Sequence, residues 1–177
     1  YENSVLTSLF LKQSGYVRYE ISNYSISGHQ SRHNRVYWRG LGWWSFGQGS
    51  TSSPWGKRFT RPKTSKDYKE WVINQCSFAL DDSLFRSSYE KLDLDERIML
   101  GLRTREGVNI RNLMKDYGWS EKKLESNFFK LIRIWDKYID SKLLKKEGDR
   151  FFLSDPRGME LSNQILIDMF RWWEIIN

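Results

Sequence analysis

The stretch SEKKLESNFFKLIRIWDKYID, residues 120–140, most constrains the fold of this chain. Its apolar residues recur every three or four positions, which is the spacing of one face of an α-helix. That face consists of Leu124, Phe128, Leu131, Ile132, Trp135 and Ile139. Ser120 stands just before it and is a typical N-cap residue. The stretch therefore predicts a long amphipathic helix.

The sequence before this helix predicts two further helices. Asp93 with Glu96 three residues later resembles a capping box, followed by apolar residues at four-residue spacing. The stretch VNIRNLMKDYG predicts a second helix, with Asn109 as its N-cap and Gly118 at its end. A helical domain is therefore expected to begin at Asp93.

The sequence after the long helix predicts a hairpin and a last helix. In KLLKKEGDRFFLS, two short strands are expected around a turn at Gly148. Asp155-Pro156 is expected to start the last helix. Its apolar face consists of Leu161, Ile165, Met169, Trp172 and Ile176. Three helices, a hairpin and a final helix predict a winged-helix-like domain over residues 93–177.

The first part of the chain mixes helix and strand patterns. NSVLTSLFLKQSGY predicts a helix, and the alternation in YVRYEIS predicts a strand, so that the two resemble half of a βαβ unit. A short strand is expected in WWSFGQGS. TSKDYKEWVINQ predicts a helix with Ser65 as its cap, and residues 76–92 are expected to be a connection.

Composition limits the classes of protein. The chain has 177 residues, a net charge of +7 and a single cysteine, Cys76. The charge favours acidic partners or simply solubility, and it does not decide between them. One cysteine forms no internal disulfide and cannot hold an iron–sulfur cluster. No apolar run approaches the roughly 18 residues of a transmembrane helix, although contact with a membrane surface stays open.

The segment HNRVYW has the residue types of a haem site. An imidazole such as His33 can ligate iron when its second ring nitrogen is held by a hydrogen bond. Tyr37 and Trp38 can stack on a flat macrocycle, and arginines can bind its carboxylates. Those arginines are Arg32, Arg35 and Arg39. The residues alone equally allow a structural role, in which His33 and Asn34 satisfy a turn while the rings fill a core.

Several motifs in a fixed order resemble one family. They are YEISNY, Gly28, HNRVYW and the pair Gly47-Xaa-Gly49. DERIMLGLRTREGVNI and FFLSDPRGMELSNQI follow later in the chain. This order resembles radical S-adenosylmethionine proteins of the HemW type, which are haem chaperones of the oxygen-independent coproporphyrinogen III oxidase-like family. The resemblance covers essentially the whole chain.

The resemblance implies that the chain is a C-terminal portion with an α/β plus α fold. Residues 1–63 would be the last elements of a partial TIM-type radical-SAM barrel, and residues 64–92 a helix and connection. Residues 93–177 would be the winged-helix-like C-terminal domain. A [4Fe–4S] cluster on a Cys-Xaa3-Cys-Xaa2-Cys motif, with S-adenosyl-L-methionine, is implied only for the full-length protein, because this chain lacks the motif.

The resemblance also implies site residues. The haem-binding positions are His33, Asn34, Tyr37 and Trp38, with Arg32, Arg35 and Arg39 as partners of the propionates. His33 is the candidate ligand of the haem iron, and His29 is its rival. Gly47, Gly49 and Thr51 would lie near the pocket for S-adenosyl-L-methionine. No catalytic residue is expected in this chain.

The function implied by the resemblance is haem binding and transfer of haem to an acceptor protein. The alternative is an oxygen-independent coproporphyrinogen III oxidase of porphyrin biosynthesis, and the HNRVYW segment favours the chaperone. A cytoplasmic location is expected, or an organellar stroma or matrix. Nucleic-acid binding is not expected, since the charges of the long helix, such as Glu121, Lys122 and Lys123, are mixed in sign.

Overall fold

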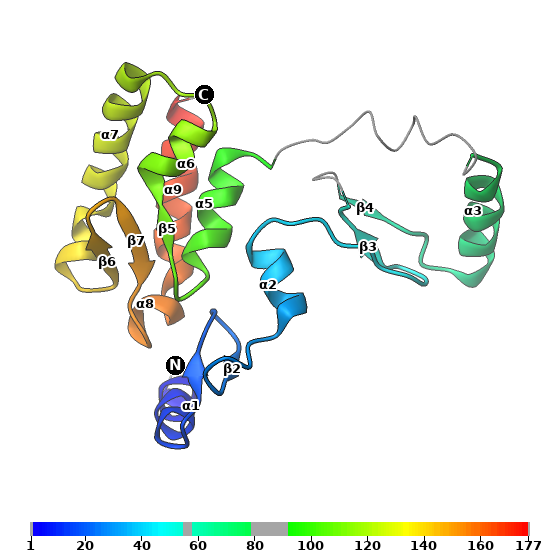
Figure 1. Ribbon diagram of the computed structural model, residues 1–177, viewed down its shortest axis with the longest axis horizontal. Helices are drawn as coiled ribbons and strands as arrows, with labels where there is room; N and C mark the ends of the chain where they lie inside the picture. Colours follow the sequence, from blue (N-terminus) through cyan, green and yellow to red (C-terminus); the bar gives the residue numbers. More distant parts are fainter. Residues whose placement is uncertain (1, 55–57, 79–91, 177) are drawn as a thin grey trace. The chain divides into compact units, whose positions relative to one another are not determined.

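The computed structural model describes residues 2–54, 58–78 and 92–176 (Figure 1). Their contacts divide the chain into two units. The first unit joins residues 1–38 to residues 93–177, and the second is residues 39–92. Helices dominate the described residues, the sheets are small and antiparallel, and no closed barrel forms among them. No described helix is both long and apolar enough to cross a bilayer.

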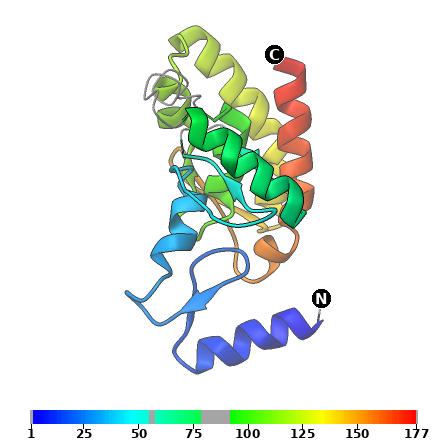
Figure 2. The same ribbon diagram turned by 90° about the vertical axis from the view of Figure 1, so that its right-hand side faces the viewer.

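The hydrophobic core lies in the C-terminal part of the first unit. Its elements are α5 (Leu94–Leu102), β5 (Val108–Asn109), α6 (Ile110–Asp116), α7 (Glu121–Asp140), β6 (Leu144–Glu147), β7 (Arg150–Leu153), α8 (Arg157–Glu160) and α9 (Ser162–Ile176). The strands pair antiparallel in the order β5-β7-β6. Helix α9 lies beside α7 and contacts α5, and the two views show this packing (Figures 1 and 2).

The prediction for the long helix is confirmed. The hydroxyl of Ser120 accepts a hydrogen bond from the backbone N–H of Lys123 at 3.3 Å and caps α7. Four residues of the apolar face are fully buried, and Ile132 and Ile139 pack against the same core. The buried four are Leu124, Phe128, Leu131 and Trp135. The apolar spacing therefore identified the helix face that forms the core.

The helix caps before α7 are confirmed in part. The side chain of Asn109 accepts from the backbone N–H of Asn112 at 2.9 Å, as expected for the cap of α6. Asp93 is the N-cap residue of α5, but its side chain makes no capping hydrogen bond, so the capping box is wrong. A cap residue can thus mark the start of a helix by position alone.

The end of the chain differs from the single helix expected. The hairpin of β6 and β7 is confirmed. Pro156 leads into the four-residue α8, and the long α9 begins only at Ser162. A Cβ at Gly158 of α8 would lie 2.0 Å from the carbonyl oxygen of Leu143, so this helix sits directly against the backbone before β6. The last part of the chain therefore forms two helices, of which α8 lies against the backbone before β6.

The N-terminal part of the first unit is less regular than its sequence pattern. It contains α1 (Glu2–Gln13), β1 (Val17–Arg18), β2 (Tyr24–Ser25) and α2 (Arg32–Trp38). The predicted strand over YVRYEIS is only two residues long, and it pairs antiparallel with β2. Its polar side is buried, because Arg18 forms ion pairs with Asp155 and Glu160. The alternation of residues in the sequence therefore predicted where the strand lies but not how long it is.

The second unit contains β3 (Thr51–Ser52), β4 (Phe59–Thr60) and α3 (Ser65–Phe78). The strand expected in WWSFGQGS is wrong: residues 43–50 make one isolated bridge, and β3 begins after them. Helix α3 is confirmed, but the hydroxyl of Thr64, not Ser65, accepts from the N–H of Asp67 at 3.2 Å. Of the predicted connection, residues 79–91 lie outside the described residues.

Candidate functional site

Helix α2 carries most of the residues that were predicted to bind haem. It spans seven residues and buries none of them. It starts after Ser31, whose hydroxyl accepts from the backbone N–H of Asn34 at 3.2 Å, which is the contact of an N-cap. So short a helix is marginal alone, and it depends on such contacts with the rest of its unit.

His33 and Tyr37 form a hydrogen-bonded pair on α2. The Tyr37 hydroxyl lies 2.7 Å from His33 Nε2, and the two rings meet edge to face with centroids 4.9 Å apart. Positions four apart in a helix lie on one face, so the helix itself brings the side chains together. The exposed imidazole keeps its Nδ1 without a hydrogen-bond partner among the residues described. One ring nitrogen of the exposed His33 is therefore held by a hydrogen bond, and the other has no such partner among those residues.

Asn34 and Trp38 attach α2 to the first unit. The Asn34 amide donates to the Tyr19 hydroxyl at 3.4 Å. The Arg103 guanidinium carbon lies 6.0 Å from the centre of the Trp38 ring, at the outer limit of a cation–π contact. Both side chains are half-buried. Tyr37 rather than Asn34 is thus the partner of the imidazole, and Asn34 helps to fix the helix.

The predicted arginines differ in their surroundings. Arg35 forms an ion pair with Glu106 at 3.0 Å, and both side chains are partly exposed. Such surface pairs contribute only about 0–1 kcal/mol, so Arg35 can exchange Glu106 for another carboxylate. Arg32 is exposed at the start of α2, whereas Arg39 is exposed in the second unit.

His29, the second candidate ligand, precedes α2. It lies in a loop, where its backbone N–H donates to the carbonyl of Ile26 at 3.0 Å. Its side chain is exposed. No hydrogen bond orients its imidazole among the described residues, in contrast to His33.

Gly47, Gly49 and Thr51 lie together at one turn of the second unit. The two glycines have φ of +95° and +65°, where a Cβ would be strained. The N–H of Ser50 donates back to the carbonyl of Gly47 at 3.3 Å. The hydroxyl of Thr51 is 2.8 Å from that of Thr60, across the β3–β4 pair.

The residues that support α2 lie far from it in the sequence and were not predicted. Glu106, which pairs with Arg35, stands 71 positions later in the chain. Arg103 and Tyr19 are likewise remote from α2 in sequence. No local pattern reveals such pairings. Within the described ranges, no three side chains of His, Cys, Asp or Glu gather at a metal-binding distance.

The chain is similar in sequence to several known proteins. A protein from Synechocystis sp. named Heme chaperone HemW is 36% identical over 90% of this chain and 41% of its own length. Its namesake from Lactococcus lactis is 26% identical over 88% of the chain and 38% of its own length. A Danio rerio protein, Radical S-adenosyl methionine domain-containing protein 1, mitochondrial, is 26% identical over 89% of the chain and 34% of its length.

The chain is thus similar, first, to a protein named for its radical S-adenosyl methionine domain. It is also homologous to proteins named Heme chaperone HemW, which confirms the resemblance found in its motifs. The chain spans about two fifths of the length of the curated relatives it matches. No family model matches the chain, and no solved structure does.

Proposed function

We propose that this chain binds haem through His33 on α2, as part of a protein that passes haem to an acceptor protein. The observation that carries the proposal is the exposed imidazole whose Nε2 is held 2.7 Å from the Tyr37 hydroxyl. A hydrogen bond to one ring nitrogen fixes the orientation of a ligating imidazole and raises its basicity. The choice of haem as the ligand comes from the relatives, which are named Heme chaperone HemW.

The other residues of α2 have separate roles in the proposal. Arg32 and Arg35 would bind the propionates, and Arg39 would add a third cation from the following segment. Asn34 and Trp38 would hold α2 against its unit through Tyr19 and Arg103. His33 is preferred over His29 as the iron ligand because only His33 has an oriented imidazole among the described residues.

The proposed setting of this site is the C-terminal portion of a radical-SAM protein. Residues 1–63 would be the last barrel elements and residues 64–92 a helix and connection. The winged-helix-like assignment for residues 93–177 is supported by three helices followed by a hairpin and by the strand order β5-β7-β6. The full-length protein would hold the [4Fe–4S] cluster and S-adenosyl-L-methionine, with the turn from Gly47 to Thr51 near the latter.

Haem transfer is preferred over oxidation of coproporphyrinogen III as the activity of the full-length protein. The names of the relatives refer to a haem chaperone and to a radical S-adenosyl methionine domain, and the HNRVYW segment is present on a helix with no buried residue. The acceptor would be met in the cytoplasm or in an organellar stroma or matrix.

Haem titration followed by the Soret band tests the proposal. The wild-type chain, His33→Ala and His29→Ala are compared, because the two substitutions remove the same group from neighbouring exposed sites. We expect His33→Ala to weaken haem binding by about tenfold or more, with His29→Ala close to wild type. Equal affinity of His33→Ala and wild type would remove His33 from the site, and a loss confined to His29→Ala would assign the iron to His29.

A further inference from the structure

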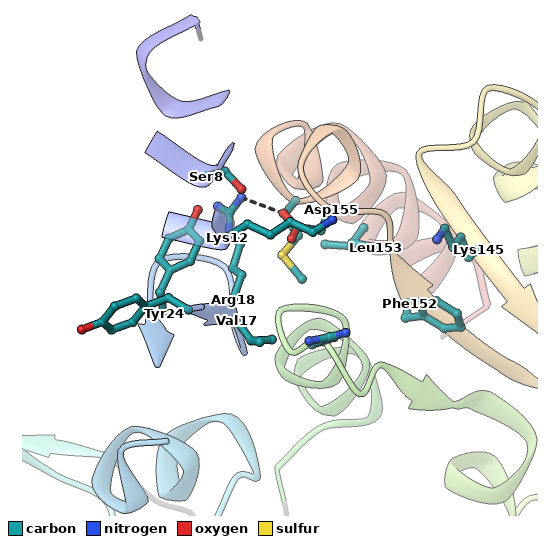
Figure 3. Close-up of a pocket in the computed structure, with 12 residues that line it drawn as sticks. Ser8, Lys12, Val17, Arg18, Tyr24, Lys145, Phe152, Leu153 and Asp155 are labelled. Atoms are coloured by element: carbon teal, nitrogen blue, oxygen red, sulfur yellow. Dashed lines mark hydrogen bonds and ion pairs between the residues drawn. The ribbon is translucent and has the colours of Figure 1, made fainter. Parts of the chain in front are cut away.

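A cavity of about 350 Å³ lies in the first unit (Figure 3). Its walls come from α1, β1 and β2 on one side and from β6, β7 and α8 on the other, with Arg105 from the loop after α5. No residue of α2 lines it. Its volume is near the lower end of the range of small-molecule sites, about 300–1,000 Å³.

The lining of the cavity has an excess of positive charge. Its basic residues are Lys12, Arg18, Arg105 and Lys145, against one carboxylate, Asp155. Arg18 is already neutralised, because it pairs with Asp155 at 3.4 Å and with Glu160 at 2.9 Å. The other three basic side chains have no acidic partner among the residues that the structure describes. An anion in the cavity would therefore meet uncompensated cations.

The carboxylate of Glu160, which pairs with Arg18, is held in its ionised form. Burial opposes its ionisation, but hydrogen bonds from Ser4 and Arg18 keep the pKa of Glu160 below its ordinary value. The side chain of Arg18 is only 6% exposed, and it also donates through Nε to the carbonyl of Ile21 at 3.1 Å. Arg18 is thus a fixed part of the cavity wall. The positive charge without an acidic partner among the described residues comes from Lys12, Arg105 and Lys145.

The rest of the lining is aromatic and apolar. Tyr24 lies under the Arg18 guanidinium, with 5.4 Å between the guanidinium carbon and the ring centre. The ammonium of Lys145 is 6.0 Å from the centre of the Phe152 ring. Leu153 and Met159 add apolar surface. Cations beside aromatic and apolar groups suit a ligand with an anionic group on an apolar body.

We infer that this cavity is a binding site for a small molecule that carries an anionic group on an aromatic body. The anionic group lies among Lys12, Arg105 and Lys145, and the aromatic body lies against Phe152. The site is independent of the haem proposal, since the two share no side chain.

Fluorescence titration with 8-anilinonaphthalene-1-sulfonate tests this inference, with N-phenyl-1-naphthylamine as the same ring system without the sulfonate. The double variant Arg105→Gln/Lys145→Gln is compared with Lys122→Gln/Lys146→Gln. Both remove two positive charges, but Lys122 and Lys146 are exposed and do not line the cavity. The backbone N–H of Arg105, which donates to Tyr19, is unaffected by the change.

We expect the cavity variant to weaken sulfonate binding by about tenfold and the control variant by less than about twofold. The uncharged probe should bind all three proteins alike. Equal sulfonate affinity of the two double variants would overturn the inference, and so would binding of the uncharged probe as tight as that of the sulfonate. Thermal unfolding checks that both variants fold, and their unchanged haem titration separates this result from the haem proposal.

Discussion

Helices α7 and α2 belong to the same unit and differ in what determines their sequences. Six of the twenty residues of α7 are buried, whereas none of the seven residues of α2 is. Helix α7 is specified by apolar spacing, which packing demands. Helix α2 carries an imidazole, two aromatic rings and two guanidinium groups, on residues of which none is buried. Residue chemistry rather than packing is therefore the basis on which α2 is proposed as the functional element.

Substitutions in the two helices should therefore have opposite effects on stability and on haem binding. Changes in the core around α7 should lower the free energy of unfolding and leave the haem affinity of the folded protein intact. Changes on the exposed face of α2 should do the reverse, because exposed side chains contribute little to stability.

Trp135→Ala has the largest expected effect on stability. Trp135 is fully buried and packs 5.1 Å, centre to centre, from the Phe151 ring. Its removal leaves a large cavity, and the free energy of unfolding should fall by about 3–5 kcal/mol in urea titration. Trp135→Phe is the matched control and should cost far less, since the indole N–H has no partner among the described residues. A loss below about 1 kcal/mol for Trp135→Ala would contradict the assignment of α7 as the centre of the core.

Gly107→Ala should be nearly as damaging. This residue has φ of +66°, and a Cβ would lie 2.1 Å from the carbonyl oxygen of Phe151. Strain and overpacking together should cost about 3 kcal/mol, measured by thermal or urea unfolding. Gly118→Ala is the control, because its φ is also positive but no atom lies within 4 Å of the added Cβ. Equal losses in the two variants would show that backbone strain alone matters.

Asp168→Asn tests the polar contacts between α7 and α9. The Lys137 ammonium lies 2.6 Å from the Asp168 carboxylate, and the Tyr138 hydroxyl donates to it at 2.8 Å. These contacts hold the pKa of Asp168 below its ordinary value, and the hydrogen bond from Lys137 has the largest effect. The carboxylate therefore stabilises the fold above its unfolded pKa of about 4, and the effect is lost as pH falls through the folded pKa.

Asp168→Asn should accordingly lower the free energy of unfolding by about 1–2 kcal/mol at neutral pH. Urea titrations from pH 7 down to about pH 3 should show the difference from wild type shrinking at the acid end. A difference that is constant over this range would contradict the charge-based account.

Tyr37→Phe should have the smallest effect on stability, within about 0.5 kcal/mol of wild type. It removes the hydroxyl that holds His33 Nε2, so haem affinity should fall by about tenfold in the Soret titration. Tyr68→Phe on α3 removes a hydroxyl from the other unit and should change neither quantity. Unaltered haem affinity in Tyr37→Phe would show that the hydroxyl does not orient the ligand.

The sequence predicted those parts that depend on local patterns. The apolar face of α7, the Asn109 cap and the turn at Gly148 all follow from short-range spacing, and each is confirmed. The motif order also identified the relatives. Local patterns suffice in these cases because the physical cause lies within one element.

Other parts depend on partners that are remote in sequence. The alternation around Arg18 predicted a strand but not the burial of Arg18, whose carboxylate partners come from residues 155 and 160. The ion pair of Arg35 with Glu106 is equally invisible in a local window. The His33–Tyr37 hydrogen bond became visible only once the segment HNRVYW was seen as a helix, which places the two on one face.

Rescue of His33→Ala by free imidazole tests the central claim most directly. If the exposed His33 of α2 ligates the haem iron, the variant should lose the Soret spectrum of the wild-type complex and regain it when imidazole is added. Its urea unfolding should match wild type within about 0.5 kcal/mol, since the side chain is exposed. A wild-type spectrum of His33→Ala without imidazole would contradict the account.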